Sequence, residues 1–270
     1  MKESFNHERQ TYVYPPPLKF LRNLFLIAIL FCLIFLGYNH LLDSSKPLYG
    51  EKITLIGDSI TEHNFTARKN WAMYINDWTG ANIQNLGISG TGFYSENHDN
   101  NTYIHIIKEI DKDTDLIGVA ASFNNTSSLE VGDVSDTVSA NTLCGYINEF
   151  FDKLQSEFPN TNIICYSQGM WGTHTPSDAD ACDYIDSIEL ICQKRNIPFI
   201  RNLFSEQSQL NPTIESVNKE LYSHDNYFDY HFYTHLLQTD CCSCDVVHPN
   251  SKGHKIIAKS LLPYFLMQFQ

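Results

Sequence analysis

The first pattern along this chain is an apolar segment near its N-terminus. Residues 24–37 carry no polar side chain, although fourteen residues fall short of the ~20 that cross a bilayer. Extension to residue 42 gives nineteen residues and admits only two polar side chains near one end. We therefore predict a transmembrane anchor over 24–42. Positive charge before the span and Asp43 after it place residues 1–23 in the cytoplasm as a tail.

A cleaved signal peptide is the main alternative to an anchor, and a buried helix of a soluble protein is a third interpretation. The 23 residues before the apolar run are long for the charged region of a signal peptide, and no A-x-A-like cleavage site follows the run. We therefore favour an uncleaved anchor, with the remainder of the chain outside the cytoplasm.

After a linker over residues 43–50, apolar strand-like runs alternate with helical patterns to the end of the chain. The strand-like runs are Ile53–Gly57, Asn82–Gly87, Asp115–Ser122, Asn162–Ser167 and Ile197–Asn202. Apolar residues at helical spacing occupy 70–78, 143–158 and 180–195, and a last helical pattern begins at Ser251. This alternation predicts βαβ units, a parallel sheet and a three-layer α/β domain over residues 51–270.

The carboxyl ends of the first three strands carry serine, glycine and asparagine residues. In an open parallel sheet, ligands bind beyond these ends. Ser59, Gly87, Asn124 and Asn125 all fall there. Ser59 is therefore either a helix cap or a nucleophile, and a nucleophilic serine needs a base, a group that orients the base, and oxyanion donors.

A histidine and a carboxylate that could serve Ser59 lie just before the last helix. In "DVVHPNSKGH", Asp245 precedes His248 by three residues. In a tight turn a carboxylate at this spacing can reach the ring Nδ1–H, which leaves Nε2 as a base. Alone, this short pattern is weak evidence, because a structural turn would have the same letters.

The order of the motifs is more informative than any one of them. "GDSIT" ends the first strand, "NLGISGTG" follows the second, "SFNN" ends the third, and D-x-x-H-P precedes the last helix. Over residues 51–270 this order resembles the SGNH (GDSL-type) hydrolases. The resemblance implies a flavodoxin-like fold with a five-stranded parallel sheet and no cofactor or metal. It also implies a nucleophile at Ser59, a base at His248 with Asp245 as its partner, and oxyanion donors from Ser59, Gly87 and Asn124.

The third motif departs from the family pattern. The family usually has G-x-N-D, whereas this chain has Ser122 in place of the glycine and Asn125 in place of the aspartate. Asn124 also begins an N-x-T sequon, so glycosylation is the alternative explanation for it. We interpret Asp58 as a structural residue that binds backbone N–H groups. Ser89 is a rival nucleophile without a signature of its own.

Charge and cysteine content narrow the function further. The net charge is −13, and because the first 23 residues carry +2, the rest carries −15. Such acidity argues against nucleic acid and anionic lipid surfaces as partners.

We interpret Cys144 and Cys165 as core thiols. We expect a disulfide from the cluster Cys241, Cys242 and Cys244 to Cys182 or Cys192, while zinc is a weaker interpretation of that cluster.

These observations predict a membrane-anchored, extracytoplasmic serine esterase that acts on small-molecule or carbohydrate esters. Aromatic side chains that could stack on sugar rings, or simply pack the domain, are Trp171, Tyr222, Tyr227, Phe228 and Tyr230. An O-acyltransferase with the same site and a non-catalytic surface binding domain are the two alternatives.

Overall fold

The computed structural model describes residues 18–62, 67–95, 102–169, 174, 177–205, 208–210 and 247–270. The chain divides into two units, Met1–Ser45 and Lys46–Gln270. The first contains helix α1 (Leu18–Ser44), whose stretch Phe20–Gly37 has a mean hydropathy of 2.4 and no buried residue. Among the described residues, α1 is the helix long and apolar enough to cross a membrane. It is compatible with a single span or with a signal sequence.

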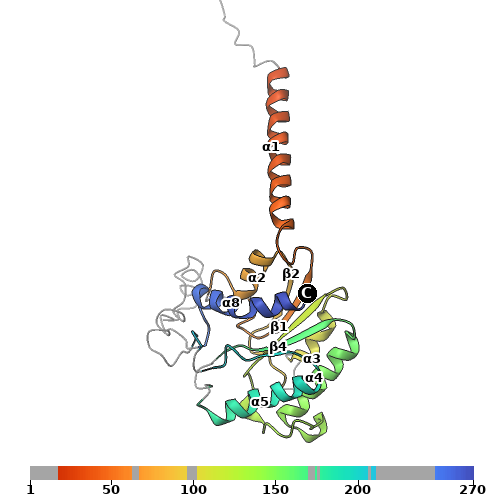
Figure 1. Ribbon diagram of the computed structural model, residues 1–270, viewed down its shortest axis with the longest axis vertical. Coiled ribbons are helices and arrows are strands. Elements are labelled where there is room, and N and C mark those ends of the chain that lie inside the picture. Colours follow the sequence, from red (N-terminus) through yellow and green to blue (C-terminus); the bar gives the residue numbers. More distant parts are fainter. Residues whose placement is uncertain are drawn as a thin grey trace, which may run out of the picture. The chain divides into compact units, whose positions relative to one another are not determined.

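The second unit is a parallel five-stranded sheet with helices on both faces (Figure 1), which confirms the predicted flavodoxin-like α/β fold. The strand order is β2-β1-β3-β4-β5. The strands are β1 (Lys52–Gly57), β2 (Asn82–Gly87), β3 (Leu116–Ala121), β4 (Asn162–Ser167) and β5 (Phe199–Ile200). The longer helices are α2 (Trp71–Thr79), α4 (Leu143–Glu157), α5 (Ala179–Lys194) and α8 (Ser251–Met267).

Short helices occupy the connections around β3. They are α3 (Tyr103–Ile106), η1 (Ile107–Glu109), η2 (Thr126–Ser128) and η3 (Val138–Ala140). The sequence patterns did not predict them, because each is too short to display a helical period. The fifth strand is shorter than predicted: only Phe199 and Ile200 pair with β4. Pro198 lies directly before this edge strand and has no N–H to extend the ladder.

Two apolar cores separate the layers of the second unit. Helices α2 and α8 cover one face of the sheet, where Trp71 packs edge-on against Tyr166 with ring centroids 5.6 Å apart. Helices α3, α4 and α5 cover the other face, where Phe93 and Phe150 lie 5.3 Å apart. All residues of β3 are buried, as expected for a central strand of a parallel sheet covered on both faces.

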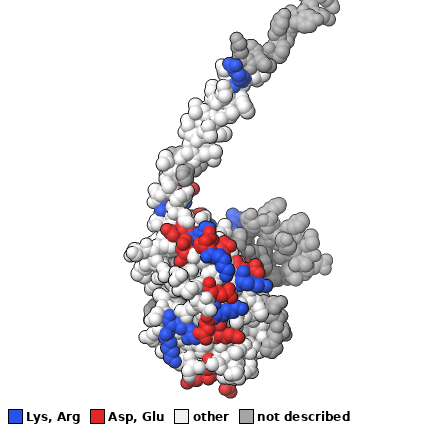
Figure 2. Space-filling view, turned by 90° about the vertical axis from the view of Figure 1, so that its right-hand side faces the viewer, with Lys and Arg blue, Asp and Glu red and all other residues white. Residues whose placement is uncertain are grey.

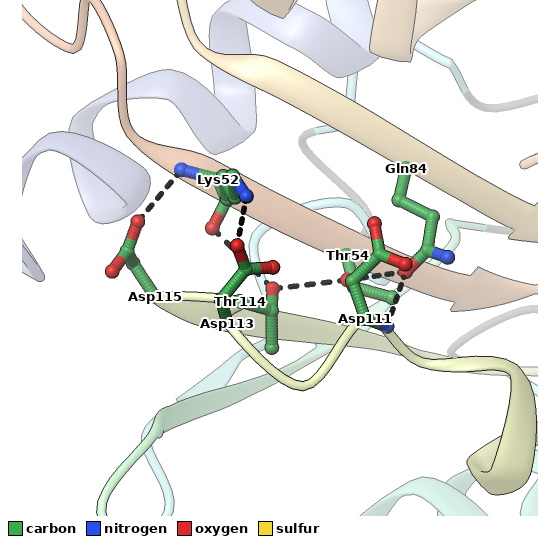
Figure 3. A network of polar contacts seen from close by, with 7 residues as sticks. All are labelled: Lys52, Thr54, Gln84, Asp111, Asp113, Thr114 and Asp115. Carbon is green, nitrogen blue, oxygen red and sulfur yellow. Dashed lines mark hydrogen bonds and ion pairs between the residues drawn. The ribbon is translucent and has the colours of Figure 1, made fainter.

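A polar network joins the amino ends of the neighbouring strands β1, β2 and β3. It consists of Lys52, Thr54, Gln84, Asp111, Asp113, Thr114 and Asp115 (Figure 3). Thr54 Oγ1 donates to Gln84 Oε1 on β2 at 2.8 Å and lies 2.9 Å from Thr114 Oγ1 beside β3. Because the hydrogen of Thr54 is used by Gln84, Thr114 is the donor between the two hydroxyls. The network fixes strand register at the end of the sheet opposite Ser59.

Charged side chains of both signs are interspersed over the face shown in Figure 2. Ion pairs among the described residues include Arg195 with Asp152 at 2.9 Å and Lys112 with Glu157 at 3.4 Å. An extended basic surface, which nucleic acid binding would need, is not seen on this face.

The described cysteines of the second unit lie mainly in the core. Cys144 and Cys165 are fully buried, which confirms their interpretation as core thiols. Cys192 is also a buried free thiol, so it is not the partner in the expected disulfide, and the alternative through Cys182 stays a prediction. Burial, with the neighbouring Cys192 thiol, raises the pKa of Cys165 well above its ordinary value. Cys241, Cys242 and Cys244 lie outside the described residues.

Candidate active site

Ser59 lies in a tight turn at the carboxyl end of β1. The carbonyl of Asp58 accepts hydrogen bonds from the N–H groups of Thr61 at 3.0 Å and Glu62 at 2.8 Å. Gly57 is required at the start of this turn, because a Cβ there would lie 2.1 Å from Thr61 Oγ1. The turn leaves Ser59 largely buried at the carboxyl end of β1, with 9% of its surface exposed.

His248 contacts Ser59 directly, although the two are separated by 189 residues. The distance from His248 Nε2 to Ser59 Oγ is 2.8 Å, which is a normal hydrogen bond. Asn250 caps helix α8 by accepting from the N–H groups of Lys252 and Gly253, and this fixes the chain just after His248. Asp245, the predicted partner of the histidine, lies outside the described residues.

Asp58 is a buried carboxylate that joins three strand ends. It is 3% exposed and its Oδ1 accepts from the Ile60 N–H at 2.9 Å, in agreement with the structural role expected for it. Its Oδ2 accepts from Ser122 Oγ at 2.6 Å and from Gln168 Nε2 at 2.7 Å. Burial raises the pKa of Asp58, and these hydrogen bonds, Ser122 first, oppose the shift because they stabilise the ionised form.

Asn124 extends the same cluster from the end of β3. Its Nδ2 donates to the Thr91 carbonyl at 2.9 Å and lies 3.3 Å from Asp58 Oδ2. The first contact is a good hydrogen bond and the second is long. Asn125 has a left-handed backbone with φ of 61° and donates through Nδ2 to the Tyr94 carbonyl at 3.2 Å. The departure from the family pattern thus leaves Asn124 beside Asp58.

Gly87 lies next to the nucleophile turn, since it pairs with Gly57 in the sheet register. A Cβ at Gly87 would lie 2.4 Å from the Glu62 nitrogen, so only glycine fits. Its N–H donates to Asn85 Oδ1 at 3.0 Å. The amide predicted to bind an oxyanion therefore has a partner within its own strand end. Ser89, the rival nucleophile, donates to Glu62 through both its N–H and its hydroxyl.

Sequence reasoning missed two residues of this cluster as functional candidates, Ser122 and Gln168. Both follow apolar strands, as Ser59 does, and this position is the only signal that could have suggested them. Their contacts with Asp58 span 64 and 110 residues, which no local pattern reveals.

A cavity of about 500 Å³ lies between the loop after β3 and helix α5, within the range of small-molecule sites, and Ser59, Asn124 and His248 are not among its lining residues. Its floor includes Phe123 and Tyr184, and the ring of His174 stacks on Phe123 with centroids 4.8 Å apart. Among the described residues, no three His, Cys, Asp or Glu side chains group as metal ligands. The aromatic residues predicted to stack on sugars, Trp171, Tyr222, Tyr227, Phe228 and Tyr230, lie outside the described residues.

Comparisons with known proteins agree with this fold and motif order. A sequence model described as the GDSL-like lipase/acylhydrolase family matches residues 55–256. A protein from Lactobacillus plantarum is 20% identical, with a TM-score of 0.62 over 83% of this chain and 100% of that chain. No curated protein matches.

Two carbohydrate esterases are also similar in structure. A family two carbohydrate esterase from Cellvibrio japonicus is 16% identical, with a TM-score of 0.52 over 83% of this chain and 63% of that chain. A family two carbohydrate esterase from Clostridium thermocellum, in complex with cellohexaose, is 14% identical, with a TM-score of 0.50 over 82% and 65%. At these identities the likeness shows the fold.

Proposed function

The chain belongs to the GDSL-like lipase/acylhydrolase family, and on this premise we propose that it is a serine esterase with Ser59 as its nucleophile. The observation that carries the proposal is the 2.8 Å contact between His248 Nε2 and Ser59 Oγ. A serine hydroxyl is a weak nucleophile unless a base within hydrogen-bond reach takes its proton, and His248 is such a base.

The reaction proceeds in two halves. Ser59 Oγ attacks the ester carbonyl while its proton passes to His248 Nε2, and the tetrahedral intermediate collapses when the histidine returns the proton to the leaving alcohol. Water then loses a proton to His248 Nε2 as its oxygen attacks the acyl carbon, and the acid leaves when the bond to Ser59 Oγ breaks and His248 returns the proton to that oxygen. We propose that Asp245 holds the His248 ring in the required tautomer, through Nδ1–H, and stabilises the imidazolium.

The oxyanion donors proposed are the N–H groups of Ser59 and Gly87 and the side-chain amide of Asn124. Two of them have partners in this structure, since Gly87 N–H donates to Asn85 and Asn124 Nδ2 to the Thr91 carbonyl. Catalytic hydrogen bonds often tighten only when substrate is bound.

We propose O-acyl groups on carbohydrate as the substrate class. The two structurally similar carbohydrate esterases support this class. A neutral sugar ester also suits a chain with a net charge of −13, which would repel anionic substrates.

We further propose that helix α1 anchors the protein in the cell membrane, with the N-terminus in the cytoplasm and the esterase domain outside. The support is the apolar stretch Phe20–Gly37 together with positive charge before it and Asp43 after it.

Steady-state hydrolysis of a soluble acetyl ester and of an acetylated sugar tests the proposed activity. We expect Ser59→Ala and His248→Ala to abolish turnover while the thermal midpoint stays near the wild-type value. Ser167→Ala is the matched control, because Ser167 is buried at the end of the neighbouring strand β4 and donates only to the Ile200 carbonyl. Ordinary turnover by Ser59→Ala would exclude Ser59 as the nucleophile.

A further inference from the structure

Ser122 occupies an unusual place between the nucleophile and a proposed oxyanion donor. It follows β3 directly and is fully buried. Its Oγ lies 2.6 Å from Asp58 Oδ2 and accepts from the Asn124 backbone N–H at 3.1 Å. Its own carbonyl accepts from the Tyr184 hydroxyl at 2.7 Å, which fixes its backbone against helix α5. One hydroxyl therefore touches both the residue before Ser59 and the backbone of Asn124.

The direction of the Ser122 hydrogen bond follows from the groups around it. The ionised Asp58 Oδ2 can only accept a hydrogen bond, and so can the Thr91 carbonyl, which lies 3.1 Å from Ser122 Oγ. The Asn124 N–H can only donate. A hydroxyl has one hydrogen, and the shorter distance assigns it to Asp58. Hydrogen bonds to a carboxylate are the stronger kind, so Ser122 is the best-placed side-chain donor to Oδ2.

The side-chain amide of Asn124 is a third donor close to the same Asp58 oxygen. Ser122 and Gln168 approach Oδ2 at 2.6 and 2.7 Å, whereas Asn124 Nδ2 remains at 3.3 Å. Two strong donors thus hold Asp58 and leave one Asn124 amide hydrogen only weakly engaged. If Ser122 lost its hydroxyl, Asp58 would be short of a donor in a buried site, where an unsatisfied charge is costly. Asn124 is the nearest replacement, and it would turn toward Asp58.

We propose that Ser122 is a positioning residue that keeps the Asn124 amide available to the oxyanion by saturating Asp58 Oδ2. The proposal rests on the proposed esterase function. It gives a role to a residue that stands where the family pattern has glycine, and a glycine has no hydroxyl with which to do this.

The test is a double-mutant cycle on ester hydrolysis in the full-length protein, with Ser122→Ala, Asn124→Ala and the double variant. Wild type is measured first, since absence of turnover there would refute the proposed function and not the role of Ser122. We expect Ser122→Ala to lower kcat by about 10- to 100-fold with little change in KM, because a donor moved by about 1 Å costs on that order. The double variant should have nearly the kcat of Asn124→Ala alone, since residues that act through one another are not additive.

Two controls separate positioning from packing. Ser167→Ala removes an equally buried hydroxyl from the next strand end without touching Asp58, and it should retain wild-type kcat. Ser122→Thr keeps the hydroxyl and should recover most of the activity lost in Ser122→Ala. A wild-type kcat in Ser122→Ala would overturn the proposal. So would a double variant whose loss of kcat equals the product of the losses in the two single variants. Both outcomes can be read even if Ser122→Thr fails to fold.

Discussion

Replacement of Asn124 with alanine separates catalysis from folding. The substitution removes the hydrogen bond from Nδ2 to the Thr91 carbonyl at 2.9 Å and the longer contact with Asp58 at 3.3 Å. A neutral hydrogen bond contributes about 1 kcal/mol net, and the long contact adds less. We therefore expect the free energy of unfolding to fall by only about 1–2 kcal/mol, so that the variant stays folded.

The expected loss of activity is much larger than this loss of stability. If Asn124 donates to the oxyanion, its contribution exists mainly in the transition state. Its removal should then lower kcat by about 10²–10³-fold and change KM little. The assay is steady-state hydrolysis of a soluble ester, with urea unfolding as the measure of stability. Asn125→Asp is the matched control, because it changes the adjacent side chain to the usual family letter. It should retain activity, although an aspartate cannot replace the hydrogen bond from Asn125 Nδ2 to the Tyr94 carbonyl and the variant should lose about 1 kcal/mol of stability.

The Asn124 prediction also requires an unmodified side chain. A glycan at this N-x-T sequon would take one of the two Nδ2 hydrogens and place a sugar among Thr91 and Asp58. Intact-mass analysis of the secreted or membrane-extracted protein should therefore find no glycan on Asn124. An Asn124→Ala variant with wild-type kcat, or a glycan at this position, would refute the reasoning and leave the oxyanion to backbone donors.

Three further predictions follow from the turn, the buried carboxylate and the apolar helix. Gly57→Ala should lower the free energy of unfolding by about 1–3 kcal/mol, because its Cβ would lie 2.1 Å from Thr61 Oγ1; an unchanged urea midpoint would contradict this. Burial raises the pKa of Asp58 above 3.8, so the folded state binds this proton more tightly than the unfolded state. Wild type should therefore gain stability relative to Asp58→Asn as pH falls through the folded pKa toward 3.8, and a difference that stays constant with pH would contradict it. Protease added to intact cells should remove the domain and leave a small N-terminal piece, whereas a cytosolic domain or a new N-terminus near residue 44 would exclude the anchor.

The sheet could be predicted from sequence because strand-like runs alternate with helical patterns along the chain. β2 and β4 have the predicted bounds, β1 begins one residue earlier than predicted, and β3 is one residue shorter at each end. The fifth strand was predicted too long because tertiary pairing, not the apolar run, sets its length: only Phe199 and Ile200 meet β4. The short helices around β3 lack enough turns for a period to be visible.

Part of the candidate site could also be predicted from sequence, and part could not. The resemblance carried by the motif order predicted that His248 acts on Ser59, and the two side chains lie 2.8 Å apart. The support beneath Ser59 could not be predicted, because Ser122 and Gln168 meet Asp58 only through tertiary structure. The hydrogen bond from Gly87 to Asn85 is different: it is a local contact two residues apart, of the kind that asparagine forms in turns.

The central claim is that Ser59 is a nucleophile activated by His248, and covalent labelling with a fluorophosphonate probe tests it most directly. We predict one adduct, mapped by peptide mass spectrometry to Ser59, with labelling lost in Ser59→Ala, strongly slowed in His248→Ala and retained in Ser167→Ala. Absence of labelling in the folded wild-type protein, or an adduct on Ser89 in place of Ser59, would contradict the account.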